Sequence, residues 1–383
     1  MNIVLLTNIL TPFRKAFYDE LNVQCKKQGH VFHVLVMTER EFNRQWHYEE
    51  YKGEYSILLK SRSIRIKHIP FYFNPDLKEQ LKKLSPDVVI MAGGYMLPSV
   101  WTACGMKRKL GYRTYFWSES HFDETREYNK ILLKIRDSIR HKIYPQFNGF
   151  WYPGEKALKL IKTYAKPDAE CFWVPNLIEN SKFKKVECGL SVSEIRKKYG
   201  IDEEKFVFFA PSRLSWEKGL EPFIKLLAKC DDAIKNRIQL VDAGDGDLEK
   251  QLRQCAEEQQ VDLKLLGYCN EKQVIELYQG VDCFVMPSLS DASPLSCVEA
   301  LWMGLPLLVS EHVGNHPEVV EQGKNGYVYS YSDEEEAIRI IEKIVLSDEN
   351  WYTNARAVST KKAQEQFELA KTTKRLLQEM KIL

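Results

Sequence analysis

Two carboxylates flank a predicted helix start in the stretch SDASPLSCVEALWMGL. Ser293 suits the N-cap of a helix, Pro294 suits the first helical position, and Gly304 is a suitable residue to end the helix. With those limits, Asp291 lies in the loop before the helix and Glu299 lies in its second turn. Carboxylates so placed either cap the helix or contact a ligand that docks on it.

The N-terminus of this helix has the chemistry of a site for an anion and a sugar. Its first turn leaves the backbone N–H groups of Leu295 and Ser296 without partners inside the helix, and such groups bind phosphate. A carboxylate at Glu299 can accept two hydrogen bonds from a sugar diol, each contributing about 1.5–3 kcal/mol. Taken singly, Asp291 is an ordinary turn residue and Glu299 an ordinary solvated helix residue, but the combination favours a ligand.

A pair of cations follows an earlier strand, in PSRLSWEKGLEPFIKLL. Arg213 and Lys218 lie five residues apart, in a loop that leads to a helix predicted at about 219–227. A guanidinium fork and an ammonium beside a helix start suit a pyrophosphate, through charge-assisted bonds and the helix dipole. The pair alone is more typical of two surface cations, but its place at the end of a strand favours the phosphate.

The glycine pattern disfavours two common nucleotide-binding classes. DAGDGDL, which contains Gly244, follows another strand, but a lone GxG is also typical of a tight turn. The full GxGxxG is missing, and the first strand-to-helix turn, TNILTPFRKAF, has no glycine, which counts against a nicotinamide dehydrogenase. The P-loop pattern GxxxxGKS/T is absent as well, which counts against a P-loop NTPase.

Short apolar runs alternate with longer amphipathic segments along the chain. NIVLLT, FHVLVM, DVVIMAG, RTYFWS, GFWYPG and CFWVPN are strand-like, and helical spacing occurs between them, as at residues 14–29 and 98–110. The alternation pauses in a charged, poorly patterned stretch at residues 181–204, and it restarts with KFVFFAPS, IQLVDAG, LKLLG, DCFVMPS, LPLLVS and GYVYS. Strands separated by helices predict parallel βαβ units with helices on both faces of the sheet.

We predict an α/β protein with two Rossmann-like domains that face each other across a cleft. The first domain covers residues 1–178 and the second residues 179–360, which fits a length of 383 residues. A last helix, at about 354–380, can pack on either domain, so that residues 361–383 can return to the first. Because ligands bind beyond the carboxyl ends of parallel strands, the informative residues are expected just after strands.

The composition is that of a globular protein in a reducing compartment. Hydrophobic residues make up 44% of the chain and the formal charge is +2, which argues against a dedicated nucleic-acid binder. Nine cysteines without a CxxC pair indicate reduced thiols. The start MNIVLLTNIL lacks a basic leader and is interpreted as a buried strand, and no apolar run approaches the ~20 residues that span a bilayer. We therefore expect a cytoplasmic protein.

Five segments between residues 205 and 330 carry a family resemblance. In order they are PSRLSWEKG, DAGDGDLEKQL, LLGYCNEKQVIELYQGVDCFVMPS, SDASPLSCVEALWMGLPLLVS and GNHPEVVEQGKNGYVYS. Their sequence and spacing resemble the nucleotide-sugar domain of GT-B glycosyltransferases of the retaining family 4. The first half resembles the family more loosely, at TNILTPFRKAFYDEL and CFWVPNLIE, and it lacks the glycine-rich loop that many relatives carry after the first strand.

The resemblance implies a role for each matching residue. Arg213 and Lys218 would hold the donor diphosphate. Glu299 matches the second acid of the family's E-x7-E motif, which contacts the ribose. Asp291 stands at the first position, one methylene shorter than the usual glutamate that contacts the transferred sugar. The other implied donor contacts are Leu295 and Ser296 for phosphate, Gly244 in the glycine turn, and Leu266 and Gly267 for the nucleobase.

The first domain offers a candidate for the acceptor side in SESHFDE, just past the strand-like YRTYFW. His121 stands where relatives often have a histidine near the transferred sugar, although a lone histidine is also common in structural roles. Glu119 and Asp123 are placed to orient its imidazole. Gly93 and Gly94, at the end of another strand, either let the acceptor approach or simply turn the chain.

The segment NKILLKIRDSIRHKIY, residues 129–144, has isoleucines every four residues and a basic face. Such a stripe is usually the buried side of a core helix, and we favour that interpretation. A helix that lies on an anionic membrane has the same pattern, with each cation adding about 1 kcal/mol near the surface. Peripheral contact with the inner face of the membrane is therefore the alternative.

The sequence as a whole predicts a retaining glycosyltransferase. It would move a sugar from a nucleotide-diphosphate sugar, preferably a UDP-sugar, to a glycan or lipid-linked saccharide in surface polysaccharide synthesis. Arg213, Lys218 and the helix N-terminus would stabilise the leaving diphosphate without a cofactor or metal ion. Asp291 and His121 complete the predicted catalytic set. Two alternatives stay open, a non-catalytic relative that binds nucleotide sugars and a sugar-nucleotide epimerase on the same fold.

Overall fold

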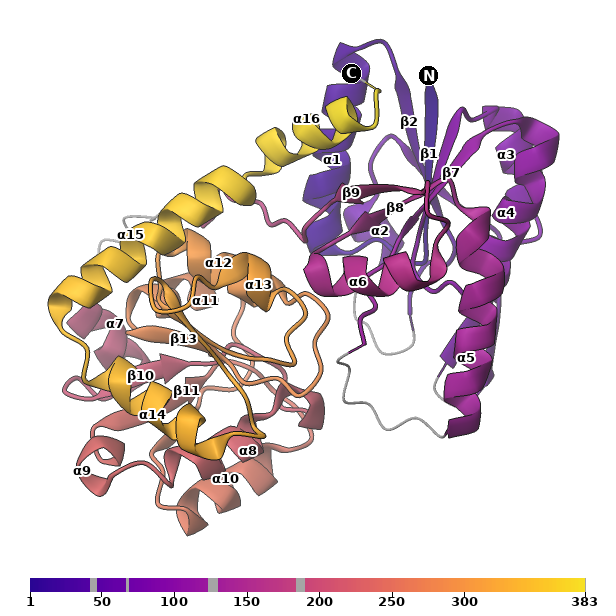
Figure 1. Cartoon of the computed structure of the whole chain (residues 1–383). Helices are drawn as coiled ribbons and strands as arrows, with labels where there is room; N and C mark the ends of the chain where they lie inside the picture. The colour runs from indigo at the N-terminus through magenta and orange to yellow at the C-terminus, as the bar shows by residue number, and fades with distance from the viewer. Residues whose placement is uncertain (42–46, 67–68, 123–129, 184–189, 383) are drawn as a thin grey trace. The chain divides into compact units, whose positions relative to one another are not determined.

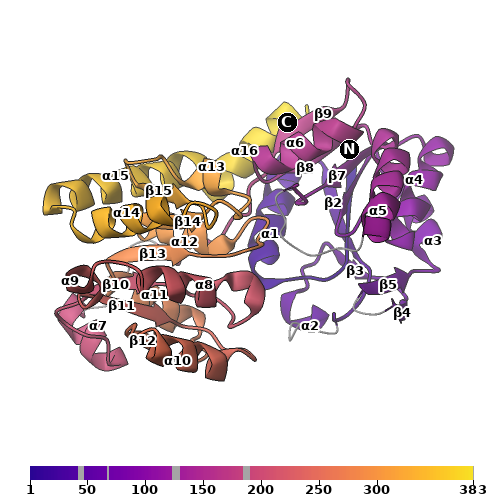
Figure 2. The same cartoon turned by 60° about the horizontal axis from the view of Figure 1, so that its bottom comes forward.

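The computed structural model describes residues 1–41, 47–66, 69–122, 130–183 and 190–382 (Figure 1). These residues form two compact units. The first unit holds the described residues up to 179 together with residues 369–382, and the second holds residues 180–368. Each unit is built on a parallel β-sheet with helices packed on its faces (Figures 1 and 2).

The sheet of the first unit has seven parallel strands in the order β3-β2-β1-β6-β7-β8-β9. Their bounds are Asn2–Thr7 (β1), Val31–Val36 (β2), Ser56–Leu58 (β3), Val88–Ala92 (β6), Arg113–Trp117 (β7), Gly149–Tyr152 (β8) and Glu170–Trp173 (β9). An antiparallel hairpin of β4 (Arg62–Ile66) and β5 (Ile69–Phe73) forms a separate two-stranded sheet. The helices are α1 (Pro12–Lys27), α2 (Tyr48–Tyr51), α3 (Leu77–Leu84), α4 (Pro98–Leu110), α5 (Lys130–Ile143), α6 (Glu155–Tyr164) and α16 (Leu369–Glu379).

The second unit has a six-stranded sheet in the order β12-β11-β10-β13-β14-β15. The strands are β10 (Phe206–Phe209), β11 (Ile238–Asp242), β12 (Leu263–Leu265), β13 (Cys283–Met286), β14 (Leu307–Ser310) and β15 (Gly326–Tyr329). The helices are α7 (Val192–Tyr199), α8 (Leu220–Leu227), α9 (Asp232–Lys235), α10 (Glu249–Glu258), α11 (Glu271–Gln279), α12 (Leu295–Trp302), α13 (His316–Val319), α14 (Glu334–Val345) and α15 (Glu349–Gln366). This is the doubly wound order of a Rossmann fold, with its switch point between β10 and β13.

Burial and local end signals explain these elements. Every residue of β6 and of β13 is buried, as expected for parallel strands that are covered on both faces. The side chain of Thr11 caps α1 by accepting a hydrogen bond from the backbone N–H of Arg14. Gly111, with φ of 79°, ends α4 in the left-handed conformation that glycine adopts at low cost. The α/β prediction with two Rossmann-like folds is confirmed.

Every run predicted as a strand forms one, but the sequence analysis missed β3 and the hairpin of β4 and β5. The stretch 181–204 was interpreted as poorly patterned, and this is wrong for its second half. There α7 begins with a capping box, in which the side chains of Ser191 and Glu194 bond to each other's backbone N–H groups. Residues 184–189 lie outside the described part of the chain.

The single helix predicted at 354–380 is also wrong, because two helices, α15 and α16, cover this region. They are separated at Phe367 and Glu368, where the chain passes from the second unit to the first. Within the first unit α16 packs against α1 and β9. The guanidinium of Arg375 lies 4.6 Å from the ring centroid of Trp173 in β9.

Candidate active site

The loops that follow β10 and β13 meet at the switch point of the second unit. These two strands are hydrogen-bonded neighbours, and parallel strands bring their carboxyl ends to the same edge of the sheet. Ligands of open α/β sheets bind in the crevice at this position. The predicted cations lie in the first loop, residues 210–219, and Asp291 lies in the second, residues 287–294.

Backbone contacts fix the first loop on the second. The N–H groups of Leu289 and Ser290 donate to the carbonyl oxygen of Glu217, at 2.9 and 3.2 Å. Gly219 has a φ of +68°, and a Cβ at this position would lie 2.0 Å from the carbonyl oxygen of Pro287. Only glycine combines this conformation with so close an approach. The residue before it, Lys218, is thereby held next to the loop after β13.

The ammonium group of Lys218 is paired with the carboxylate of Asp291. Their Nζ and Oδ2 atoms are 2.5 Å apart, and the two side chains are only 15% and 18% exposed. The family resemblance implied that Lys218 holds the diphosphate and that Asp291 contacts the transferred sugar. The structure brings the two together across 73 residues of sequence. The interpretation of Lys218 as a surface cation and of Asp291 as an ordinary turn residue does not fit this burial.

Arg213 lies in a different environment from Lys218. Its guanidinium donates to Oε1 of Glu217 at 3.0 Å, and its side chain is 64% exposed. An exposed ion pair of this kind contributes little to stability, about 0.2–1 kcal/mol. The guanidinium is therefore free to take a better partner at small cost.

Helix α12 begins one residue later than predicted. Pro294 is its N-cap, with extended backbone angles of φ −65° and ψ 130°, so the prediction that Ser293 caps the helix is wrong. Leu295 and Ser296 become the first two helical residues, whose N–H groups have no acceptor within the helix. The other end is as predicted, since Gly304 follows the helix with a φ of +69°.

Two buried groups show that the Lys218–Asp291 pair lies near the N-terminus of α12 and the end of β11. Burial raises the pKa of the Cys297 thiol, in the first turn of α12; the Asp291 charge raises it further and the Lys218 charge lowers it. Burial raises the pKa of Asp242, the last residue of β11, to about 8, against the opposing effects of hydrogen bonds and of Lys218. One ammonium thus acts on a group at the end of β11 and on a group in the first turn of α12.

Glu299 is half-buried and has a protein partner. The hydroxyl group of Tyr278, from α11, donates to its Oε2 at 2.9 Å. Burial raises the pKa of the Glu299 carboxyl to about 7, although the hydrogen bond from Tyr278 lowers it. The interpretation of Glu299 as a solvated helix residue is therefore wrong. Tyr278 was missed in the sequence, where the only signal is a tyrosine on the apolar face of an amphipathic helix, which needs a partner for its hydroxyl.

Packing accounts for the glycine turn after β11. A Cβ on Gly244 would lie 1.6 Å from the carbonyl oxygen of Ser212, and one on Gly246 would lie 2.4 Å from that of Leu214. The N–H of Leu214 donates to the carbonyl of Asp245 at 2.8 Å. The glycines therefore let the loop after β11 contact the loop that carries the cations.

The predicted nucleobase residues lie at the end of the neighbouring strand, β12. The N–H of Leu266 donates to the carbonyl of Asp242 at 2.9 Å, and Gly267 has a φ of +73°. Leu266 and Gly267 are half-buried. They are thus joined to the same edge of the sheet as the cations.

The loop after β14 supports the start of α12, and the sequence analysis missed this contribution. The N–H of Gly314 donates to the carbonyl of Asp291 at 2.7 Å. The buried amide of Asn315 donates to the carbonyl of Pro294 at 3.2 Å. The motif GNHPEVV contains both residues, so the signal was present only as part of a family resemblance.

The family model for glycosyl transferases group 1 matches residues 191–366. Residues 191–366 therefore form a glycosyl transferases group 1 domain. The fold of the chain is that of Anabaena Alr3699/HepE in complex with UDP, with a TM-score of 0.76 at 14% identity over 100% of both chains.

Two curated relatives of this chain have names that describe their reactions. The alpha-monoglucosyldiacylglycerol synthase of Streptococcus pneumoniae is 24% identical over 309 residues, which are 75% of this chain and 65% of that one. The second is the GalNAc-alpha-(1->4)-GalNAc-alpha-(1->3)-diNAcBac-PP-undecaprenol alpha-1,4-N-acetyl-D-galactosaminyltransferase of Campylobacter jejuni. It is 23% identical over 275 residues, 72% of this chain and 69% of that one.

In the first unit, His121 is buried just beyond the end of β7. Glu119 accepts a hydrogen bond from Arg14, in the first turn of α1, at 2.7 Å, so its carboxylate forms an ion pair with that helix. That Glu119 orients His121 stays a prediction. The guanidinium of Arg14 also lies 3.8 Å from the ring centroid of Trp117. Asp123, the other predicted orienting residue, lies outside the described residues.

Gly93 turns the chain at the switch point of the first unit, between β1 and β6. Its φ is +108°, and a Cβ there would lie 2.1 Å from Oδ1 of Asn8. Gly94 would place its Cβ at an ordinary distance of 3.5 Å from Leu97. Gly93 therefore has a structural reason to be glycine, which Gly94 lacks.

Helix α5 contradicts the core interpretation in its first half. Ile131 is 66% exposed and Ile135 is 46% exposed, whereas Ile139 is half-buried and Ile143 fully buried. The isoleucine stripe is thus a core stripe only toward the C-terminus of the helix. Across the described helices, none has the length and apolar character needed to cross a membrane.

No cluster of three or more His, Cys, Asp or Glu side chains suited to hold a metal ion occurs among the described residues. The eight described cysteines are free thiols, and six of them are buried.

Proposed function

We propose that this glycosyltransferase moves a sugar from a UDP-sugar to a glycan or lipid-linked saccharide, with retention of configuration at the anomeric carbon. The observation that carries the proposal is the half-buried Lys218–Asp291 pair at the N-terminus of α12, the helix that also bears Glu299. A cation, free helical N–H groups and two carboxylates within one loop and helix suit a molecule that joins a diphosphate to a sugar and a ribose.

Each group has hydrogen-bonding sites left to contact such a nucleotide sugar. The ammonium of Lys218 has three N–H donors, of which Asp291 takes one. The guanidinium of Arg213 has five, of which Glu217 takes one. Both cations can therefore contact phosphate without losing their present partners. The remaining lone pairs of Asp291 can accept from hydroxyl groups of the transferred sugar.

In the transfer, the bond from the anomeric carbon to the phosphate oxygen breaks, and its electron pair goes to the leaving diphosphate. The acceptor hydroxyl oxygen bonds to the same carbon and loses its proton. Negative charge grows on the diphosphate, where Lys218, Arg213 and the N–H groups of Leu295 and Ser296 stabilise it. Groups that are already in place do not have to reorganise during the reaction, so the loss of any one of them raises the barrier.

The relatives support the choice of substrates. The Anabaena protein of the same fold has been solved in complex with UDP and with UDP-glucose, which favours a uridine nucleotide. The curated relatives are named for a diacylglycerol glycolipid and an undecaprenol-linked saccharide, which favours an acceptor that carries a lipid. The exposed aliphatic half of α5, with Lys134 and Arg136 beside it, supports peripheral contact with the cytoplasmic face of a membrane where such acceptors lie.

Single substitutions test the phosphate role. Arg213→Ala and Lys218→Ala are each expected to lower the rate of UDP release from UDP-sugars by about two orders of magnitude or more. Lys225→Ala is the control, because Lys225 is an exposed cation of the adjoining helix α8 that pairs only with Glu221 among the described residues. Circular dichroism verifies that all three variants fold. Near-normal turnover in both site variants would refute the assignment.

The same assay separates the alternative functions. A non-catalytic relative would bind UDP-sugars and release no UDP. An epimerase would convert the donor into a sugar nucleotide of unchanged mass, which mass spectrometry and chromatography distinguish from transfer or hydrolysis.

A further inference from the structure

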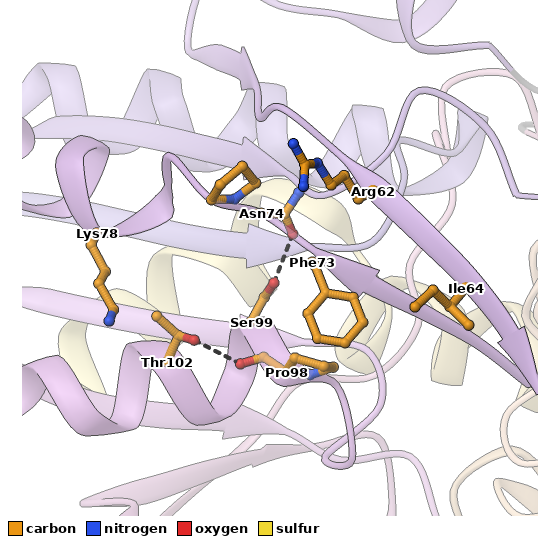
Figure 3. Close-up of a pocket in the computed structure, with 9 residues that line it drawn as sticks. Arg62, Ile64, Phe73, Asn74, Lys78, Pro98, Ser99 and Thr102 are labelled. Atoms are coloured by element: carbon orange, nitrogen blue, oxygen red, sulfur yellow. Dashed lines mark hydrogen bonds between the residues drawn. The ribbon is translucent and has the colours of Figure 1, made fainter.

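The β4–β5 hairpin and the first turns of α3 and α4 enclose a cavity of about 490 Å³ in the first unit (Figure 3). Its lining shares no residue with the donor site or with the neighbourhood of His121. Ligand pockets of proteins are commonly about 300–1,000 Å³. The volume is therefore sufficient for a small organic ligand, and the lining residues indicate which kind.

One face of the hairpin forms an apolar and basic wall. Arg62 and Phe73 are directly opposed in the antiparallel register, and Ile64 is two residues along the same strand, so all three side chains lie on one face. Ile64 is 56% exposed and Phe73 is 44% exposed. The opposite face carries Tyr72, which is buried in the core of the unit. The hairpin thus exposes Ile64 and Phe73 toward the cavity, although its other face packs in the core of the unit.

The polar side chains at the floor of the cavity already have hydrogen-bond partners within the protein. The buried Ser99 donates to Oδ1 of Asn74 at 2.7 Å, and Asn74 donates to the carbonyl groups of Met37 and Lys60 at 2.7 and 3.0 Å. Thr102, one turn along α4, donates to the carbonyl of Pro98 at 2.9 Å (Figure 3). These donors are in use, so a ligand would have to bind through other groups.

Those groups are two cations, Arg62 and Lys78, which lie on opposite sides of the lining (Figure 3). Within the described part of the chain, neither has an ion pair or hydrogen bond. Asp76, two residues before Lys78, instead accepts the backbone N–H of Lys60 with both oxygens, at 3.1 Å. The lining has no acidic residue. The cavity therefore carries a positive charge that no described protein group neutralises.

We propose that this cavity binds a phosphate ester that carries an apolar group. The guanidinium of Arg62 matches two phosphate oxygens through its planar fork, and Lys78 supplies a second charge. The apolar group would cover Ile64 and Phe73 and remove their exposed surface from water. Two sources have this chemistry, an anionic lipid and a soluble phosphate ester with an apolar substituent.

Binding of three probes to the full chain, measured by calorimetry without nucleotide, tests the proposal. The probes are dihexanoyl phosphatidic acid below its micelle concentration, phenyl phosphate and inorganic phosphate. One of the two esters is expected to bind saturably and more tightly than inorganic phosphate, and which one it is identifies the source. Arg62→Gln and Lys78→Gln should each weaken binding about tenfold or more, as expected for the loss of a charge-assisted bond.

Matched controls separate this site from bulk charge and from the donor site. Arg108→Gln and Lys83→Gln remove exposed cations of α4 and α3 that do not line the cavity, and they should leave the affinity unchanged. UDP binding should be unaffected in all four variants, so failure here is distinguishable from failure of the proposed transfer. The proposal is overturned if no ester binds saturably, if inorganic phosphate binds equally well, or if the cavity variants match the controls.

Discussion

Replacement of Glu299 by glutamine should stabilise the ligand-free protein at neutral pH while it weakens donor binding. Glu299 is half-buried and accepts a hydrogen bond from Tyr278, and partial burial raises the pKa of its carboxyl from the ordinary 4.5 to about 7. Glutamine has nearly the same shape and keeps an oxygen to accept the Tyr278 hydrogen bond. The substitution therefore removes the buried charge and little else.

The sign and size of the effect follow from linkage. The unfolded chain loses the Glu299 proton near pH 4.5, while the folded chain holds it to about pH 7. The wild-type protein is therefore penalised progressively as the pH rises from 4.5 to 7, and the full penalty applies above pH 7. A pKa difference of this size corresponds to about 3 kcal/mol at most. Glu299→Gln should match the wild type near pH 4.5 and exceed its free energy of unfolding by up to that amount at pH 8.

Urea titrations of both proteins at pH 5 and pH 8 measure this difference. If the two units unfold in separate transitions, the transition that UDP shifts to higher urea belongs to the second unit. Glu276→Gln is a control of opposite sign on the same helix as Tyr278. The pKa of Glu276 is lowered, chiefly by its hydrogen bond from Lys198, so its removal should destabilise the protein at neutral pH. Equal stability of Glu299→Gln and wild type at pH 8, with the Glu276 control behaving as expected, would refute a raised carboxyl pKa.

Three further outcomes are expected. UDP should bind wild type more tightly at pH 8 than at pH 6, because ionised Glu299 is the better acceptor for ribose hydroxyls, and calorimetry should find this dependence lost in Glu299→Gln. Gly219→Ala should lower the melting temperature and weaken UDP binding, because its Cβ would lie 2.0 Å from the Pro287 carbonyl oxygen. Gly105→Ala is the control, because open space surrounds Gly105, and it should be neutral or stabilising by about 0.5–1 kcal/mol. The double variant Ile131→Ser, Ile135→Ser should bind less to vesicles rich in anionic lipid. The control is Leu346→Ser, at a similarly exposed residue of the second unit, which should bind as the wild type does. Equal binding of both variants would contradict a membrane role for α5.

The sequence by itself determined the alternation of strands and helices, the α/β class and the placement of the site residues just after strands. These features depend on local periodicity and end signals, such as the glycine at position 304 that ends α12. The same locality explains the errors. Pro294 shifted the start of α12 by one residue, and no local signal marked the break at Phe367 between α15 and α16.

Only the tertiary structure decided which charges meet and which groups are buried. Lys218 pairs with Asp291 across 73 residues, Glu299 accepts a hydrogen bond from Tyr278 of another helix, and half of the α5 stripe faces solvent. Spacing along one helix or strand cannot reveal a partner from another element. The pKa of a carboxyl depends on how much water that partner leaves around it, and this is set by packing between segments distant in sequence.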